Sequence, residues 1–165
     1  IFWGEAGPLR NGKGSCYEAS VRVPCIVRWP GKVAGGVRSD AVFSTLDFMP
    51  TFASLAGFNV PEDRVIDGVD QIDLLLGKNP IGKRRTFLFL GQRPDYHING
   101  IRRGKWKYLK AKHNVYFFAR DTTREKVEEL YDLESDIGET KNLAKKHPEI
   151  VAELKQLMGK IMKVK

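Results

Sequence analysis

Lys13 is the residue whose type and setting most clearly suggest chemistry, because it lies between two glycines in the polar segment of residues 9–18. Glycines permit sharp turns and let a backbone approach a ligand closely, and a lysine ammonium is a compact charge that can contact an oxyanion. The spacing is not that of a Walker P-loop. Lys13 therefore predicts an anion-binding loop, with Glu18 and Arg22 paired structurally beneath it. The alternative is an exposed lysine in an ordinary turn.

A second polar cluster surrounds His97, with Arg93, Asp95 and Tyr96 just before it. A histidine side chain changes its charge near neutral pH, so His97 is a candidate substrate-binding residue. The alternative is a surface loop with an incidental histidine.

The two cysteines, Cys16 and Cys25, show no metal-type spacing such as C-x-x-C. Nine positions apart, they could bridge between adjacent segments. The interpretation we favour is two free, partly buried thiols. No metal ligands and no catalytic residues are assigned within this chain.

The chain of 165 residues has a net charge of +8, and its positive charge is concentrated in the second half. Residues 1–80 contain 8 Lys and Arg against 9 Asp and Glu, whereas residues 81–165 contain 20 against 11. Such a region attracts polyanions or anionic small molecules, and salt weakens the attraction. The alternative is a solvated lysine-rich surface. No apolar run approaches the roughly 20 residues of a membrane-spanning helix, so no membrane span is expected.

The first half contains two predicted elements. The short apolar run in residues 21–29 predicts a strand covered on both faces. A helix is predicted over residues 44–57, with Ser44 or Thr45 as its N-cap and Gly57 after its end. Residues 77–80 contain glycine and proline and indicate a boundary.

The second half is predicted to hold a small sheet and a helix. Strands are expected at residues 86–90, 98–102, 106–111, 115–119 and 129–133, the second and third forming a hairpin. A helix beginning near Pro148 carries one apolar stripe with lysines opposite.

The alternation of Lys105 and Lys107 with Trp106 and Tyr108 is typical of the two faces of a strand. Base stacking on the two aromatic rings is the alternative. Because strand alternation explains the pattern more simply, no nucleic-acid partner is expected.

Ordered motifs along nearly the whole chain resemble the arylsulfatase-type sulfatase family of the alkaline-phosphatase-like superfamily, in its C-terminal portion. They are G-K-G-x-x-Y-E at residues 12–18, R-V-P at 22–24, W-P-G at 29–31, D-x-x-P-T at 47–51, R-x-G-K-W-K-Y at 102–108 and E-L-Y-D-L at 129–133. The resemblance implies an α/β fold. Residues 1–80 would be the C-terminal end of the catalytic α/β domain and its large mixed sheet. Residues 81–165 would be a C-terminal subdomain, an antiparallel sheet packed with the last helix.

The resemblance also implies hydrolysis of sulfate esters, including those of sulfated carbohydrates. Lys13 matches the sulfate-contacting lysine of the family, and His97 lies in the kind of C-terminal loop from which family members reach substrate. The nucleophile, a formylglycine, and the calcium ligands would lie upstream, because no C-x-P-x-R or S-x-P-x-R string is present. We therefore interpret the chain as a fragment, inactive alone, whose partners are the missing N-terminal catalytic region and a sulfated small molecule or glycan.

One departure from the family pattern is Ala19-Ser20, where the family usually has two glycines. Ala19 would be strained if that position required a positive φ. Two rival functions stay open: a phosphatase or phosphonate monoester hydrolase of the same superfamily, and a non-catalytic polyanion-binding module. By resemblance, the protein would be periplasmic, secreted or lysosomal.

Overall fold

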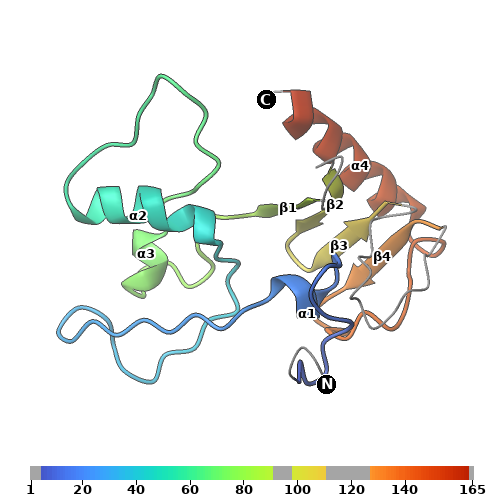
Figure 1. The fold of residues 1–165 in the computed structure, drawn as a ribbon, viewed down its shortest axis with the longest axis horizontal. Helices are drawn as coiled ribbons and strands as arrows, with labels where there is room; N and C mark the ends of the chain where they lie inside the picture. Colours follow the sequence, from blue (N-terminus) through green and yellow to red (C-terminus); the bar gives the residue numbers. More distant parts are fainter. Residues whose placement is uncertain (1–4, 91–97, 111–126, 164–165) are drawn as a thin grey trace. The chain divides into compact units, whose positions relative to one another are not determined.

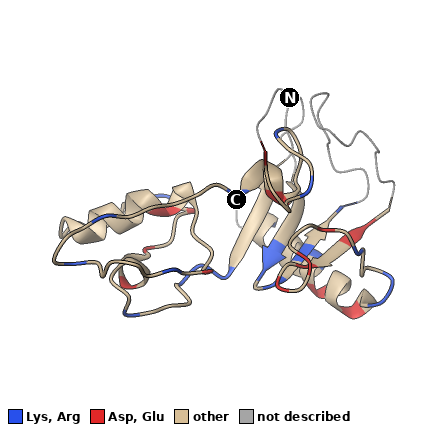
Figure 2. Ribbon diagram, turned by 90° about the horizontal axis from the view of Figure 1, so that it is seen from below, with Lys and Arg blue, Asp and Glu red and all other residues tan. Residues whose placement is uncertain are grey.

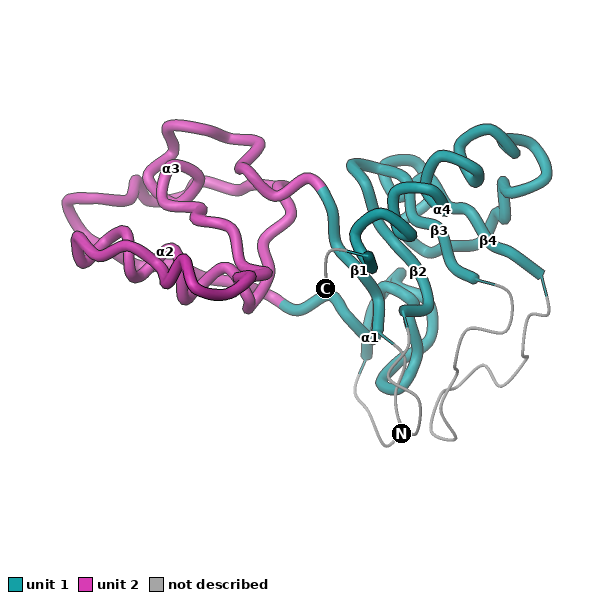
Figure 3. Tube along the Cα trace, turned by 90° about the horizontal axis from the view of Figure 1, so that it is seen from above, with its two compact units in different colours: residues 1–23, 86–165 teal, residues 24–85 magenta. Residues whose placement is uncertain are grey.

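The structure is a computed structural model that describes residues 5–90, 98–110 and 127–163. Its elements are α1 (Glu18–Val21), the 3-10 helix η1 (Thr45–Asp47), α2 (Phe48–Leu55), α3 (Ile72–Leu75), β1 (Thr86–Leu90), β2 (Ile98–Arg103), β3 (Trp106–Leu109), β4 (Glu129–Asp132) and α4 (Pro148–Lys163) (Figure 1). The chain divides into two compact units. Unit 1 comprises Ile1–Val23 with Thr86–Lys165, and unit 2 comprises Pro24–Arg85 (Figure 3).

In this division Ile1–Val23 groups with the second half of the chain, and the domain boundary expected between residues 80 and 81 stays a prediction. The physical reason is burial. Cys16 and Tyr17 pack in one apolar cluster with Phe89, Leu109 and Tyr131 of the sheet. Residues near the start of the chain therefore complete the core of unit 1, a long-range contact that sequence order does not reveal.

The sheet of unit 1 has four antiparallel strands in the order β1-β2-β3-β4. The predicted hairpin is confirmed, with Arg103 opposite Trp106 across a tight turn. Gly104 has a φ of 57° in this turn, a conformation that glycine adopts without steric cost. The predicted strand at 86–90 and the one near 129–133 are also confirmed. The strand predicted at 115–119 lies outside the described residues.

Alternation along the strands gives the sheet two different apolar faces. On one face, Ile101, Tyr108 and Leu130 pack against Leu154 and Met158 of α4. On the other face, a second cluster forms around Tyr17 and is completed by Cys16, Phe89, Leu109, Tyr131 and Leu133. The helix predicted near Pro148 is thus confirmed as a docking helix, and the segment after Lys13 covers the opposite face.

Unit 2 is organised around polar side chains. Ser44 caps η1 in a capping box with Asp47, which confirms the predicted helix start. The buried Asp47 carboxylate accepts hydrogen bonds from the Arg84 guanidinium and from the backbone N–H groups of Ser44 and Val69. Burial alone would raise the pKa of the Asp47 carboxyl, but hydrogen bonds from Arg84 and the backbone outweigh it and hold that pKa below its usual value.

The strand predicted at residues 21–29 is wrong in this structure. Val21 ends α1, and residues 22–29 form neither helix nor strand. A strand needs a neighbour to satisfy its backbone hydrogen bonds, and no strand among the described residues lies beside this segment. Val23 and Ile26 are instead exposed. In the described part of the chain, no helix combines the length and apolarity that crossing a membrane requires.

Candidate functional site

Lys13 lies at the exposed tip of a closed loop. The Ala19 backbone N–H donates to the Arg10 carbonyl at 3.2 Å, which joins the two ends of the loop. Within it, the Ser15 hydroxyl donates to the Gly12 carbonyl at 3.1 Å. Gly14 takes a φ of 94°, which a residue with a Cβ rarely adopts. Local hydrogen bonds and glycine geometry thus present the lysine at a defined bend.

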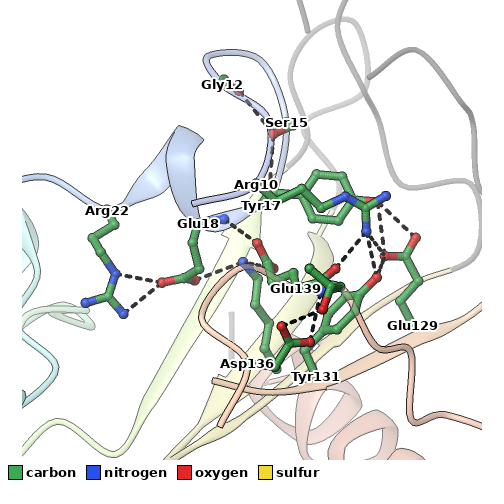
Figure 4. A network of polar contacts seen from close by, with 12 residues as sticks. Arg10, Gly12, Ser15, Tyr17, Glu18, Arg22, Glu129, Tyr131, Asp136 and Glu139 are labelled. Atoms are coloured by element: carbon green, nitrogen blue, oxygen red, sulfur yellow. Dashed lines mark hydrogen bonds and ion pairs between the residues drawn. The ribbon is translucent and has the colours of Figure 1, made fainter. Parts of the chain in front are cut away.

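Arg10 anchors the first end of this loop to the sheet (Figure 4). Its guanidinium lies 4.0 Å from the centre of the Tyr17 ring, a cation–π contact. The same group donates to the Tyr131 hydroxyl at 2.9 Å and to the Glu139 carbonyl at 3.1 Å. Arg10 therefore ties the loop to β4 and to the turn that follows it.

Tyr17 and Tyr131 converge on the buried carboxylate of Glu129, to which they donate at 3.0 Å and 2.6 Å. Burial raises the pKa of both hydroxyls, and the negative charge of Glu129 raises it further. Both tyrosines therefore stay protonated and act as donors. This arrangement satisfies a carboxylate that is inaccessible to water.

Lys107 anchors the second end of the loop from below. Its ammonium is fully buried and lies 2.9 Å from a carboxylate oxygen of Glu18 and 2.8 Å from one of Glu139. The Glu18 carboxylate also accepts a hydrogen bond from the Arg22 guanidinium at 2.9 Å, so the predicted Glu18–Arg22 pair is confirmed. Two cations and two carboxylates therefore form one charge cluster beneath the Lys13 loop.

The pKa values of the two carboxyl groups in this cluster are shifted in opposite directions. Burial alone would raise the pKa of the Glu18 carboxyl, but Lys107 and Arg22 outweigh it and hold that pKa below its ordinary value. Burial raises the pKa of the Glu139 carboxyl, and Lys107 offsets this only in part.

The other residues singled out from the sequence do not extend this site. His97 lies outside the described residues. Both cysteines are free thiols, with Cys16 buried and Cys25 exposed. Ala19 lies within α1, and the non-glycine residues with positive φ in the described ranges are Asn11 and Glu139. The strain expected at Ala19 is therefore absent.

Part of the positive charge on the described residues of unit 1 is paired. Figure 2 shows lysines and arginines interspersed with acidic residues. Arg103 contacts Glu153 at 2.8 Å, and Lys155 contacts Glu128 at 2.7 Å. The lysine-rich surface is therefore partly neutralised within the unit, and charge alone does not define a polyanion site.

Sequence reasoning missed Lys107, Glu129 and Glu139 as parts of this arrangement. Lys107 was assigned only to a strand face, and its partner Glu18 lies 89 positions away in the sequence. The available signal was the E-L-Y-D-L segment and the Asp136–Glu139 turn, which carry Glu129 and Glu139. Across residues 5–90, 98–110 and 127–163, no group of three or more His, Cys, Asp or Glu side chains is placed to hold a metal ion.

Comparison with known proteins gives a consistent result. A family model described as N-sulphoglucosamine sulphohydrolase, C-terminal, matches residues 11–164. N-acetylgalactosamine-6-O-sulfatase from Bacteroides thetaiotaomicron is 35% identical over 158 residues, covering 94% of this chain and 30% of that protein. Arylsulfatase A from Homo sapiens is 37% identical over 180 residues, covering 93% of this chain and 33% of that protein.

A solved structure from work on the metabolism of multiple glycosaminoglycans by Bacteroides thetaiotaomicron superposes with a TM-score of 0.75. It is 34% identical, and the match covers 93% of this chain and 32% of that chain. These matches identify the small antiparallel sheet and its C-terminal helix as a sulfatase C-terminal domain. The chain belongs to the family of N-sulphoglucosamine sulphohydrolase C-terminal domains. It spans about a third of the length of the curated relatives it matches.

Proposed function

We propose that this chain forms the C-terminal part of a sulfatase that hydrolyses sulfate esters, with Lys13 contacting the sulfate group. The observation that carries the proposal is the loop itself. A lysine stands at the exposed tip of a closed turn whose two ends are fixed by buried polar contacts. The family match supplies the chemical class of the ligand.

The ammonium of Lys13 would bind a sulfate oxygen and stabilise the negative charge that develops as the sulfuryl group is transferred. Such stabilisation depends on a donor that is already in place before the reaction begins. The contacts of Arg10 and Glu18 with the sheet provide this rigidity. His97 is proposed as a second substrate contact on the grounds of its position in a polar loop.

A calcium ion and a formylglycine nucleophile are expected of the whole enzyme and would supply, respectively, charge stabilisation and the attacking group. Within the described residues no cluster of carboxylates or histidines fits a metal. We therefore derive no step of the proposal through either group. The residues of this chain bind and orient the sulfate, while the nucleophile comes from elsewhere.

A sulfated carbohydrate is the substrate class we favour. One similar protein is by name an N-acetylgalactosamine-6-O-sulfatase, and one similar structure comes from work on glycosaminoglycan metabolism. The net charge of +8 is also compatible with a polyanionic substrate. Release of sulfate from 6-sulfated N-acetylgalactosamine, measured beside other sulfated sugars, would test this choice. Equal inactivity on every sulfated sugar would reject it.

The direct test is the Lys13→Ala substitution in the intact protein that contains this chain, assayed with 4-nitrophenyl sulfate. Loss of one preorganised donor is expected to lower kcat/KM by roughly 100- to 1,000-fold. Lys145→Ala, which removes an exposed lysine of unit 1, is the matched control and is expected to leave turnover unchanged. Normal kcat/KM in the Lys13→Ala protein would reject the assignment.

The same assay with 4-nitrophenyl phosphate separates the rival function. A sulfatase is expected to turn over the sulfate ester far faster than the phosphate ester. The opposite preference would identify a phosphatase of the same superfamily.

A further inference from the structure

Glu139 has a backbone conformation that is uncommon for a glutamate, and its side chain is more deeply buried than is usual for this residue type. Its φ is 53°, in the left-handed region that few residues other than glycine adopt. Its side chain is completely buried, at 0% exposure. Residues held in this conformation persist only where the surrounding structure determines them, and they concentrate at functional sites. The position of Glu139 is therefore set by its contacts rather than by local preference.

Those contacts reach both ends of the Lys13 loop. The Glu139 carbonyl accepts a hydrogen bond from Arg10 at 3.1 Å, at the beginning of the loop. Its carboxylate accepts the backbone N–H of Glu18 at 2.7 Å, at the end of the loop. One residue thus connects the two ends of the loop through its own backbone and side chain (Figure 4).

Lys107 makes this connection rigid. It pairs with the carboxylates of Glu139 and Glu18 at once, and it lies 4.5 Å from the centre of the Phe89 ring. A buried ammonium between two carboxylates leaves neither charge unpaired, whereas a shift of the loop would separate them in a low-dielectric interior. The strand β3, which carries Lys107, therefore fixes the height of the loop above the sheet.

We propose that Glu139 is a positioning residue for sulfate binding. Its contacts with Arg10, Glu18 and Lys107 hold the two ends of the loop together and so set where the Lys13 ammonium meets the sulfate. The proposal rests on the proposed function of Lys13. Glu139 itself is fully buried, so a direct contact with a bound sulfate is not part of the proposal. Its effect is therefore transmitted entirely through Lys13.

A double-mutant cycle in the intact protein separates positioning from general stability. Glu139→Gln keeps the size of the side chain and an oxygen that can accept the Glu18 N–H, but it removes the negative charge that pairs with Lys107. Displacement of a catalytic group by about 1 Å can lower the rate by around 100-fold. We expect Glu139→Gln to lower kcat/KM for 4-nitrophenyl sulfate by about 10- to 100-fold, on the basis of such a displacement. In the Lys13→Ala background the same substitution is expected to change kcat/KM by less than about twofold, because contacts that act as one unit are not additive.

The matched control is Glu153→Gln, which removes an exposed carboxylate of α4 that pairs with Arg103 of β2. It is expected to be silent in both backgrounds. Thermal unfolding in the presence and absence of inorganic sulfate gives a readout independent of turnover. Sulfate is expected to raise the Tm of the unsubstituted protein. This rise should shrink most, and by the same amount, in the Lys13→Ala and doubly substituted proteins, and less in the Glu139→Gln protein.

The outcomes are distinguishable. If Glu139→Gln lowers kcat/KM by the same factor in both backgrounds, or leaves it unchanged, Glu139 does not act through Lys13 and this proposal is overturned, while the sulfatase assignment stands. If Lys13→Ala alone is silent, both proposals are overturned. Should Glu139→Gln fail to fold, Arg10→Lys tests the same connection at a side chain that is partly exposed, and the same non-additivity is expected.

Discussion

The two units of this chain distribute their apolar and polar residues in opposite ways. In unit 1, apolar side chains cover both faces of the sheet, and buried charged groups such as Lys107 and Glu18 anchor the Lys13 loop. In unit 2, the most buried side chains are polar, including Asp47, Thr51 and Gln71. Many of its large apolar residues are exposed instead, with Ile26 at 92% and Phe58 at 71%.

The difference shows which unit carries its own stability. Burial of apolar surface is the main force that stabilises a folded domain, and unit 1 has this core within its own residues. Unit 2 is organised by hydrogen bonds and one buried ion pair, and its apolar groups stay available to a partner. Extended exposed apolar surfaces mark interaction sites.

The largest expected effect is at Lys107. Lys107→Met replaces the ammonium with an apolar side chain and leaves Glu18 and Glu139 buried without the Lys107 cation. Breaking a buried ion pair in this way lowers the free energy of unfolding by about 3–5 kcal/mol. Amide hydrogen exchange in the intact protein should show lost protection in unit 1 and little change in unit 2. Lys105→Met, which removes the exposed pair with Asp132, is the matched control and should have a much smaller effect. Equal effects of the two substitutions would contradict the comparison.

Leu154 tests the apolar core directly. Leu154→Ala removes a buried side chain of α4 and should destabilise unit 1 by about 3 kcal/mol, as cavity-forming substitutions do. Phe58→Ala removes a larger but exposed side chain of unit 2 and should change stability by less than about 0.5 kcal/mol. Denaturation followed by hydrogen exchange gives both values. A larger loss at Phe58 than at Leu154 would show that unit 2 has a core of its own.

Ser44 tests the polar organisation of unit 2. Ser44→Ala removes the side-chain oxygen that caps η1, while its backbone N–H can still donate to Asp47. Loss of such a cap costs about 1 kcal/mol. Thr45→Ala, at the neighbouring exposed position, is the control and should be nearly neutral. Protection of amides in α2 is the measurement. Greater loss with Thr45→Ala would mean that the cap is assigned to the wrong residue.

The smallest expected effect is the dependence of stability on pH. The lowered pKa of Asp47 means that its contribution to unit 2 is complete above the unfolded value of 3.8 and is lost as the pH falls through its lower folded pKa. The raised pKa of Glu139 acts in the opposite direction. Its contribution to unit 1 is complete below 4.5 and is lost as the pH rises through its folded pKa.

Protection factors measured from acid to neutral pH, corrected for intrinsic exchange, check this contrast. The stability of unit 1 relative to that of its Glu139→Gln variant should decline as the pH rises above 4.5. A relative stability that increases over that range would show that the pKa of Glu139 is lowered rather than raised.

Local sequence signals were sufficient for most of unit 1. The hairpin could be predicted because Gly104 permits its turn and the flanking residues alternate. The last helix could be predicted because Leu154 and Met158 belong to one apolar stripe. These patterns depend on neighbours in the sequence, and such patterns are the primary signal of secondary structure.

Long-range contacts could not be predicted. The apolar run at residues 21–29 has the composition of a strand, but a strand requires a partner that the described residues do not provide. Lys107 reads as an ordinary surface lysine until Glu18 and Glu139 are brought to it from distant positions. The anion-binding loop itself was predicted from glycine placement and family resemblance, whereas the residues that anchor it were not.

The central claim is that Lys13 binds sulfate, and a crystal structure of the intact protein with inorganic sulfate or a sulfated substrate tests it most directly. We expect the Lys13 ammonium about 2.8 Å from a sulfate oxygen, the distance of a charge-assisted hydrogen bond, with Glu139 still joined to Arg10 and Glu18. A sulfate bound in the active site with the Lys13 side chain directed away from it would contradict the account.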